Sequence, residues 1–424
     1  MTFRLKTLLA VALAVASGLT ATTSTASAAR NMEIALQDDS VFLSQLYYGR
    51  TKALARARQL HVTRIRSNVP WSSVLGRQAR RRTAPQHPAY NFAFYDAMID
   101  EANAHGIAVQ LALTGPAPAW ATGNHKMGPF APKARYYRDF VKAAVLHFKG
   151  RVDRYSIWNE PNYVGWLAPL NRAPALYRAL YSTGWNTIKH YDPTAQVLFG
   201  ETAPYWLNGR ETAPLVFLRG VTCAGQNWRP SRPCGTLQTD GFAHHPYDFD
   251  HPPSYRYPGA DNVTLSGLPK LSRALTLLAR YRLLRTPRGG APDLYLTEYG
   301  YFSSGTRRVS QSRQASYLVQ AFQMAQKNPR VREMLQYLLI KPRRPYTFFD
   351  TSIASGRGTP YAAFRKLMAW ARSAVKSGRA ASKPVRPAQP SSGGGGSTAN
   401  PPSNGGGTVC PNLPVQPPAG TPCP

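Results

Sequence analysis

The sequence predicts an α/β protein built as a (β/α)8, or TIM, barrel. Short apolar segments of strand length alternate with longer segments of helical spacing along residues 30–378, which is the order that a barrel of parallel strands requires. Glutamates follow two of the predicted strands. The range is long enough for one such barrel, which typically takes about 250 residues.

The predicted elements follow one another in near-regular alternation. The strands are expected at residues 32–36, 62–69, 107–113, 152–158, 195–199, 239–247, 294–297 and 334–340. The helices are expected at residues 46–60, 95–105, 137–145, 176–188, 268–284, 315–325 and 362–375. No helix is expected in the insertion that follows the fifth strand, and the sequential crossovers are the usual right-handed ones.

Local signals justify individual elements. Tyr95, Met98 and Ala102 share one helical face, and Gly106 after this helix is a typical helix terminator. In the second strand, side chains alternate between the two faces, so Arg64 and Arg66 are expected on the same face.

Glu160 is expected at the carboxyl end of the fourth strand. Residues 152–158 include β-branched and aromatic residues, and Pro161 cannot continue the hydrogen-bond ladder because it lacks an N–H. A barrel of this kind carries its functional side chains at the carboxyl ends of its strands. The alternative is that Glu160 stabilises the amino end of a following helix.

Glu298 repeats this arrangement after the seventh strand. The chain has seven glutamates, so two at equivalent strand ends favour a shared function over scattered surface charge. Cleavage of a glycosidic bond requires such a pair of carboxylates.

Four segments carry a resemblance to a known family. They are residues 158–162 (WNEPN), Thr297 with Glu298, residues 245–247 (HPY), and Arg66. In order and strand placement, over residues 30–378, the chain resembles glycoside hydrolases of clan A, most closely family 39 and related family 5 sequences.

The resemblance implies a retaining hydrolase that cleaves O-glycosidic bonds of a polysaccharide or glycoconjugate by double displacement. Glu160 would be the general acid/base and Glu298 the nucleophile. Asn159 would bind the sugar 2-hydroxyl, while Arg66 and Tyr247 would hold the nucleophile. Arg66 is expected to keep Glu298 ionised, and a less solvated Glu160 is expected to have a raised pKa.

The sequence departs from the family pattern in two places. Clan members commonly have a tryptophan at the end of the eighth strand, where this chain has Ile340 and Lys341, with Phe348 and Phe349 the nearest aromatic candidates. Tyr299 stands where family 39 members often have a tryptophan. The sugar, its linkage and exo or endo action are therefore not predicted.

Further residues are assigned from their positions. His245 is expected to face the site and His244 to be structural, since neighbours in a strand point to opposite sides. Glu201 is expected to pair with a surface arginine rather than act as an acid. Aromatic residues in loops beyond strand ends could stack on sugars or cover the core: Trp71, Trp120, Trp166, Trp206 and Tyr301.

Both ends of the chain are expected to lie outside the barrel. Residues 1–29 combine basic residues, an apolar run and small residues before a cleavage site, as secretory signal peptides do. No other segment is long and apolar enough to span a membrane, so secretion or attachment to the cell envelope is expected. Residues 379–424 are expected to be a flexible linker and tail. Within them, residues 382–424 are rich in Pro, Gly and Ser and are expected to be dispensable for folding and hydrolysis.

The cysteines form two close pairs in sequence. Cys223 with Cys234 and Cys410 with Cys423 are expected to be disulfides in an exported protein. Their spacing does not suit zinc, so no metal is expected, and no other cofactor is indicated.

The chain carries a formal net charge of +32. Such a surface attracts polyanions. With a signal peptide, an anionic envelope glycan is expected as the partner rather than nucleic acid, unless the arginines simply solvate helix faces. The alternative function is a catalytically weak glycan- or polyanion-binding envelope protein on a barrel scaffold. The oligomeric state is not predicted.

Overall fold

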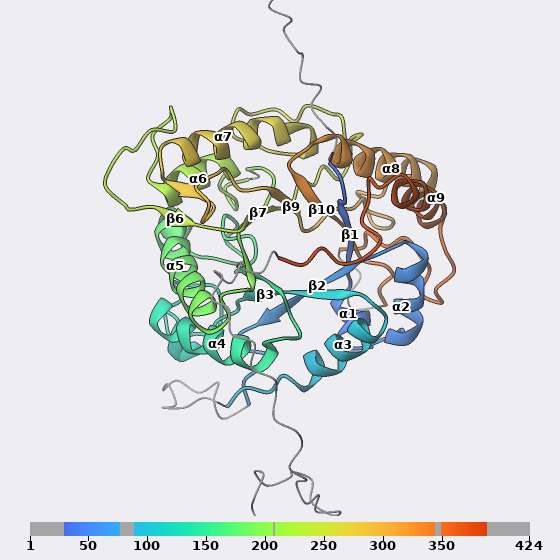
Figure 1. Ribbon diagram of the computed structural model, residues 1–424, viewed down its shortest axis with the longest axis horizontal. Coiled ribbons are helices and arrows are strands. Elements are labelled where there is room, and N and C mark those ends of the chain that lie inside the picture. The colour runs from blue at the N-terminus through green and yellow to red at the C-terminus, as the bar shows by residue number, and fades with distance from the viewer. Residues whose placement is uncertain (1–28, 77–88, 207, 344–348, 388–424) are drawn as a thin grey trace, which may run out of the picture. The chain divides into compact units, whose positions relative to one another are not determined.

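The computed structural model describes residues 29–76, 89–206, 208–343 and 349–387. In this part of the chain, parallel strands form a closed barrel inside a ring of helices, which confirms the predicted fold (Figure 1). Around the barrel the strands run in the order β1, β2, β3, β4, β5, β7, β9 and β10. Their bounds are Glu33–Gln37, Arg64–Pro70, Ala108–Thr114, Arg154–Ile157, Gln196–Thr202, Gly241–His244, Leu294–Leu296 and Val331–Tyr337.

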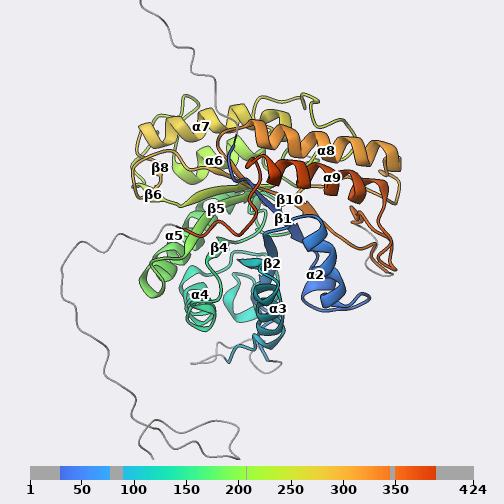
Figure 2. The same ribbon diagram turned by 45° about the vertical axis from the view of Figure 1, so that its right-hand side comes forward.

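Helices follow the strands and cover the outside of the barrel (Figure 2). They are α1 (Asp39–Phe42), α2 (Arg50–Gln59), α3 (Ala93–Ala104), α4 (Ala134–Phe148), α5 (Ala173–Tyr191), α6 (Pro214–Thr222), α7 (Leu268–Arg280), α8 (Gln311–Lys327) and α9 (Ala362–Lys376). Three short 3-10 helices are η2 (Ala119–Ala121), η3 (Leu170–Arg172) and η4 (Leu265–Gly267).

Two differences from the sequence prediction concern the region after β5. α6 lies inside the segment expected to be an insertion without a helix, and Pro214 occupies its first turn, where proline is tolerated. The helix predicted at residues 268–284 ends earlier than expected, at Arg280, because β8 (Leu284–Arg285) pairs with β6 (Leu237–Gln238) in a small separate sheet.

The burial pattern explains why the strands and helices form. All seven residues of β3 are buried, as expected for a parallel strand covered on both faces. In α4, Tyr137, Phe140, Ala144 and Phe148 point inward at helical spacing. Gly106 after α3 has φ +72°, the left-handed conformation expected of a helix terminator.

The amino-terminal end of the barrel interior contains buried charges. Arg64 lies 3.2 Å from Glu33 and 2.6 Å from Asp153. Arg154 lies 2.7 Å from Glu33 and 2.5 Å from Glu333. We call these five residues the lower cluster.

The carboxyl-terminal boundary of the barrel lies later than predicted. The sequence prediction placed it after residue 378, whereas residues up to Pro387 belong to the same compact unit. Ala380 and Ala381 are buried, and Ala380 pairs with Met32. Val385 donates its N–H to Glu33 at 3.0 Å and accepts from Arg64 at 3.2 Å. We call residues 380–387 the strap.

Several other predictions concern the chain ends and cysteines. Cys223 and Cys234 form a disulfide, as expected. Cys410, Cys423, residues 1–28 and residues 388–424 lie outside the described residues. Ala29, assigned to the leader, is buried and donates its N–H to Gln326 at 2.9 Å. Among the described residues, none of the helices has the length and apolar character needed to cross a membrane.

Candidate active site at the barrel mouth

The candidate site lies where four strands end. Glu160 follows β4, Glu298 follows β9, His245 follows β7 directly, and Glu201 lies within the last residues of β5. Parallel strands bring their carboxyl ends together at one rim of the barrel. Residues far apart in sequence therefore converge on a single cluster.

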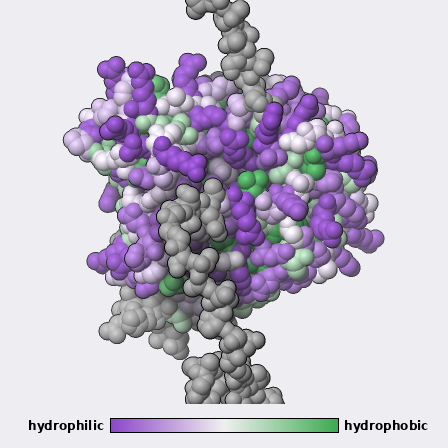
Figure 3. Space-filling view, in the orientation of Figure 1, coloured by the Kyte–Doolittle hydropathy of each residue, from purple (hydrophilic) through white to green (hydrophobic). Residues whose placement is uncertain are grey.

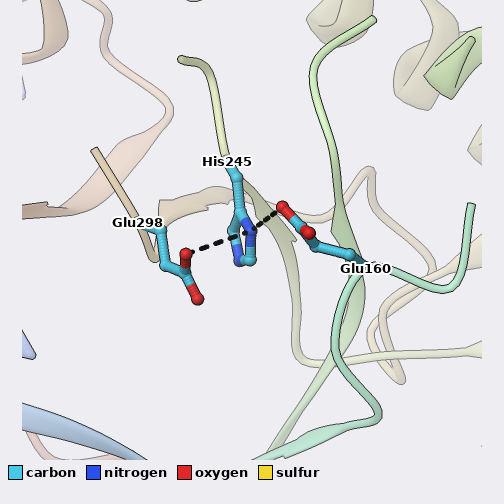
Figure 4. Close-up of side chains that lie close together, drawn as sticks. All are labelled: Glu160, His245 and Glu298. Atoms are coloured by element: carbon cyan, nitrogen blue, oxygen red, sulfur yellow. Dashed lines mark hydrogen bonds and ion pairs between the residues drawn. The ribbon is translucent and has the colours of Figure 1, made fainter. Parts of the chain in front are cut away.

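Glu160 and Glu298 face each other across His245 (Figure 4). His245 Nδ1 lies 3.0 Å from Glu160 Oε1 and 3.7 Å from Glu298 Oε2. One oxygen of each glutamate and a ring nitrogen of His245 all lie within 4.8 Å of one another. The two predicted carboxylates thus share one small space.

The backbone around Glu160 is held in an uncommon conformation. Trp158 and Glu160 have φ values of 69° and 36°, in the left-handed region that non-glycine residues rarely adopt. Glu160 donates its N–H to the carbonyl of Glu201 at 2.9 Å, which ties the end of β4 to β5. Such outliers concentrate at functional sites, where surrounding contacts hold them in place.

Arg66 is the fully buried centre of the cluster. It donates to Glu298 at 2.8 Å, to Asn159 Oδ1 at 2.7 Å, to Glu201 at 3.0 Å and to Gln37. Arg66 therefore contacts the expected nucleophile, as the family resemblance implied.

Tyr247 and Asn159 complete the contacts predicted around the two glutamates. Tyr247 donates its hydroxyl to Glu298 Oε2 at 3.3 Å. Asn159 is buried, and its amide oxygen accepts from Arg66. Asn159 thus has a protein partner in addition to the sugar hydroxyl that the resemblance assigned to it.

The two histidines have different environments. His245 is buried and contacts Glu160 and, at 2.7 Å, Glu201. His244 points elsewhere, with Nδ1 2.8 Å from the Thr202 hydroxyl and Nε2 2.8 Å from a backbone carbonyl. Burial lowers the pKa of His244 to about 4. His245 therefore faces the site and His244 is structural.

Glu201 was assigned to a surface ion pair, and this interpretation is wrong. Its side chain is completely buried and bonds to Arg66 and His245, so it belongs to the same cluster as the other two glutamates. The Thr297 hydroxyl also donates to it at 2.7 Å. The sequence signal available was the placement of Gly200 and Glu201 at a strand end, the same placement that marked Glu160.

The charges of the cluster shift several pKa values. Burial raises the pKa of Glu298, and the positive charges of His245 and Arg66 offset this only in part. Arg66 lowers the pKa of Glu298, as expected, but the expectation omitted the cost of burying the carboxylate, which is the larger effect. Burial opposes charge on Glu201 as well, but Arg66 and His245 outweigh it and lower its pKa to about 2.

The pKa of His245 shifts in the opposite direction to that of an isolated buried histidine. Burial favours its neutral form, but the charge of Glu298 and the hydrogen bonds with Glu160 and Glu201 raise its pKa to about 10. The three glutamates thus lie around two cationic partners, Arg66 and His245. Glu160, His245 and Glu298 could also ligate a divalent ion, but Arg66 would place a fixed positive charge beside it.

Most of the predicted sugar-stacking residues do not offer a face to a substrate. Trp71 is completely buried and stacks on Phe140, and Trp120 is buried beside it. Tyr301 is buried and donates its hydroxyl to the carbonyl of His251. These three cover the core, because the loops that carry them fold back over it.

The other aromatic candidates differ from these three in exposure or in position. Trp166 is half-buried against the core, and Trp206 is 57% exposed on the loop after β5. Phe349 packs edge-on against Tyr247 at 5.8 Å between ring centroids and against Tyr337 at 5.4 Å. Phe349 therefore lies beside the end of β10, the strand after which the sequence lacks the tryptophan of the family pattern, whereas Phe348 lies outside the described residues.

The barrel and its mouth place the protein in a definite structural class. It is a (β/α)8 protein with an acidic cluster at the carboxyl ends of its strands. No model of a known protein family matches the sequence, and no curated protein matches it either.

Several solved structures with a similar fold are glycoside hydrolases. A family 39 glycoside hydrolase from the gut symbiont Bacteroides cellulosilyticus WH2 has a TM-score of 0.58 and 18% identity, over 81% of this chain and 64% of that one. A monomeric beta-xylosidase from Caulobacter crescentus CB15 has a TM-score of 0.52 and 16% identity, over 80% and 69%. A family 5 broad-specificity endoglucanase from Clostridium acetobutylicum has a TM-score of 0.51 and 12% identity, over 80% and 96%.

These similarities establish the fold that the sequence resemblance implied. The chain spans less than two thirds of the length of the Bacteroides protein. At these identities the shared feature is the (β/α)8 barrel, and the chemistry must be argued from the residues at the mouth.

Proposed function

We propose that the protein is a retaining glycoside hydrolase. The observation that carries this proposal is the distance between the glutamates, whose nearest oxygens lie within 4.8 Å of each other. Retaining glycosidases place their carboxyl groups about 5–5.5 Å apart, while inverting ones need about 6.5–9.5 Å to accommodate a water molecule. The short separation supports attack by a carboxylate on the sugar itself.

Glu298 is the nucleophile in this proposal. Arg66 and Tyr247 hold its two oxygens, at 2.8 and 3.3 Å, and so fix the direction of attack on the anomeric carbon. The bond to the leaving group breaks as the bond to Glu298 forms, giving a covalent glycosyl-enzyme. Burial raises the pKa of Glu298. As the pH is lowered, activity should therefore be lost at a higher pH than the titration of an ordinary carboxylate would give.

Glu160 is the general acid and then the general base. It donates a proton to the departing oxygen in the first step and takes one from water in the second. Its contact with His245 supplies a second protonatable group beside it. Asn159, beside Glu160 in sequence, is proposed to orient the sugar.

The substrate is proposed to be a carbohydrate of the cell envelope, with the protein exported to reach it. Hydrophilic residues dominate the face seen in Figure 3, and the excess of basic residues gives a charge of +32, which would attract an anionic glycan. Binding to such a polymer should weaken steeply as ionic strength rises. Equal binding to neutral and acidic polymers at low salt would contradict this substrate class.

The stereochemistry of the product tests the mechanism. Proton NMR of the first-formed sugar during hydrolysis of an aryl glycoside should show the same anomeric configuration as the substrate. An inverted product would contradict the role of Glu298 as nucleophile. Binding of envelope glycans with no turnover of any aryl glycoside would instead favour the binding-protein alternative.

A further inference from the structure

Glu201 occupies a bulge in the barrel wall. The pairing of β5 with β7 shifts register between Gly200 and Thr202, so Glu201 is an extra residue at this point. Gly200 has φ +113°, and a Cβ there would lie 2.5 Å from the carbonyl oxygen of Ala243. Only glycine allows this close approach, and the bulge turns Glu201 into the mouth of the barrel.

One oxygen of Glu201 accepts three hydrogen bonds. Arg66, His245 Nε2 and the Thr297 hydroxyl lie 3.0, 2.7 and 2.7 Å from Oε2. Arginine can only donate, so the oxygen that it shares with His245 acts as an acceptor. An ionised Glu201 therefore requires a hydrogen on His245 Nε2.

This hydrogen bond decides what the other ring nitrogen can do. With Nε2 as the donor to Glu201, Nδ1 faces Glu160 at 3.0 Å. A carboxylate and an imidazole nitrogen at this distance share one proton, carried by either atom. His245 thus connects Glu201, whose carboxylate accepts three hydrogen bonds, to Glu160, the expected acid/base.

We propose that Glu201 is a positioning residue: it fixes the His245 imidazole with Nδ1 toward Glu160, so that His245 and Glu160 together hold the proton delivered to the leaving group. This inference rests on the proposed glycosidase function. It assigns to Glu201 and His245 a part in catalysis that goes beyond the pair of glutamates.

The proton balance of the step is simple. The Oε–H bond of Glu160 breaks as the leaving-group oxygen gains the proton, and Glu160 becomes a carboxylate. In the second step that carboxylate takes a proton from the attacking water. His245 Nδ1 can then share this proton with Glu160, and Glu201 keeps its charge throughout.

Removing the negative charge of Glu201 should lower the pKa of the proton that His245 and Glu160 share. A negative charge next to an imidazole favours its protonated form, so Glu201→Gln should make the shared proton easier to lose. The other charged or titratable groups that interact with Glu201 or His245 are unchanged in this variant. They are Arg66 (β2), Glu160 (after β4), Tyr177 (α5), His244 (β7), Tyr247, Glu298 (after β9) and Glu333 (β10).

The first test needs no substrate. In protein labelled with ¹⁵N, the signals of His245 are identified by their absence in His245→Asn, among nine histidines. Wild-type His245 should keep a hydrogen on Nε2 throughout the titration and lose its second ring hydrogen well above the ordinary histidine pKa of about 6.5. A His245 that loses the second hydrogen near this value, or carries its remaining one on Nδ1, would overturn the proposal even if Glu201→Gln does not fold.

The second test compares variants by pH profile. In Glu201→Gln, the alkaline limb of kcat/KM for a glycoside with a poor leaving group should move to lower pH by about 1–3 units. An activated leaving group does not need the proton, so its profile should move far less. The matched control Thr297→Val removes a neutral donor to the same Glu201 oxygen and should leave the alkaline limb in place.

The outcomes separate this inference from the proposed function. Equal losses on both substrates with no shift of the alkaline limb would make Glu201 merely structural and overturn the inference, while hydrolysis by the wild-type protein would still support the glycosidase. If the wild-type protein hydrolyses no glycoside, the proposed function fails and with it the catalytic role of Glu201. The NMR titration then still decides the His245 tautomer.

Discussion

The two ends of the barrel interior both contain buried charges, but they differ in their access to solvent. Arg64 and Arg66 lie on the same strand and the same face, two residues apart. Arg64 belongs to the lower cluster, where the side chains of Glu33 and Glu333 are fully buried and that of Asp153 is 15% exposed. Arg66 belongs to the mouth, where the side chains of Glu160 and Glu298 are 17% and 10% exposed.

This difference separates a structural cluster from a functional one. The lower cluster has three carboxylates and two arginines, and of these carboxylates only Asp153 reaches solvent. Backbone groups of Val385 in the strap contact the buried Glu33 and Arg64. At the mouth, three glutamates lie around Arg66 and His245, and two of them reach solvent. Buried ion pairs alone are weak indicators of function. A carboxylate that lies close to other carboxylates and that a substrate can reach is a stronger indicator of function.

The largest expected effect is on turnover, from a change at the mouth. Glu298→Ala should reduce kcat by about 10⁴-fold or more, because the nucleophile is lost. A small anion such as azide should fit the vacated space and restore cleavage of an activated glycoside, with an azide product of opposite configuration. The free energy of unfolding should change little by comparison. A variant that keeps its turnover would break the assignment of the mouth as the catalytic end.

A change at Glu160 should depend on the leaving group. Glu160→Ala should slow hydrolysis of a poor leaving group by about 10²–10⁴-fold, the usual contribution of a general acid. Formation of the glycosyl-enzyme from an activated aryl glycoside should be much less affected, because the departing oxygen needs no proton. Pre-steady-state bursts measure this step directly. Equal slowing of both substrates would argue against the acid role.

A change in the lower cluster should reduce stability rather than turnover. Arg154→Met removes the partner of Glu33 and Glu333, at 2.7 and 2.5 Å, and leaves buried carboxylates unpaired. The free energy of unfolding should fall by about 3–5 kcal/mol, measured by denaturant titration. The kcat of the folded fraction should be unchanged. A loss of kcat without a loss of stability would end the distinction between the two clusters.

Truncations give the smallest effects and locate the boundary of the domain. A chain that ends after Pro387 should keep its stability to within about 0.5 kcal/mol, the usual range for changes away from packed features. A chain that ends after Lys376 should lose more, since it lacks buried Ala380 and Ala381 and the Val385 contacts to the lower cluster. Thermal unfolding of both chains measures the difference. Equal stability would restore the earlier boundary predicted from composition.

The sequence predicted the barrel and the pair of glutamates because these depend on local signals. Strand periodicity, prolines and the polar residues at strand ends are visible without neighbours, and they located Glu160, Glu298 and His245. Arg66 was found because the family resemblance drew attention to it.

The sequence did not predict features that arise only when distant segments meet. The inward direction of Glu201 depends on the bulge against β7, and a strand taken alone does not show a bulge. Trp71 lies beyond a strand end, but burial of its ring depends on α4 packing over it. The strap has the composition of a linker. Its contacts with buried charges are made by backbone groups, which composition does not reveal.

The pairing of the strap with the start of β1 brings the two ends of the folded unit together. Met32 pairs with Ala380, and Asn31 donates its N–H to the carbonyl of Gly378 at 3.3 Å. Neighbouring ends are what circular permutation requires. A short linker could join them at the end of the barrel opposite the mouth. New ends could then open in an exposed loop, and the order of the strands around the barrel would not change.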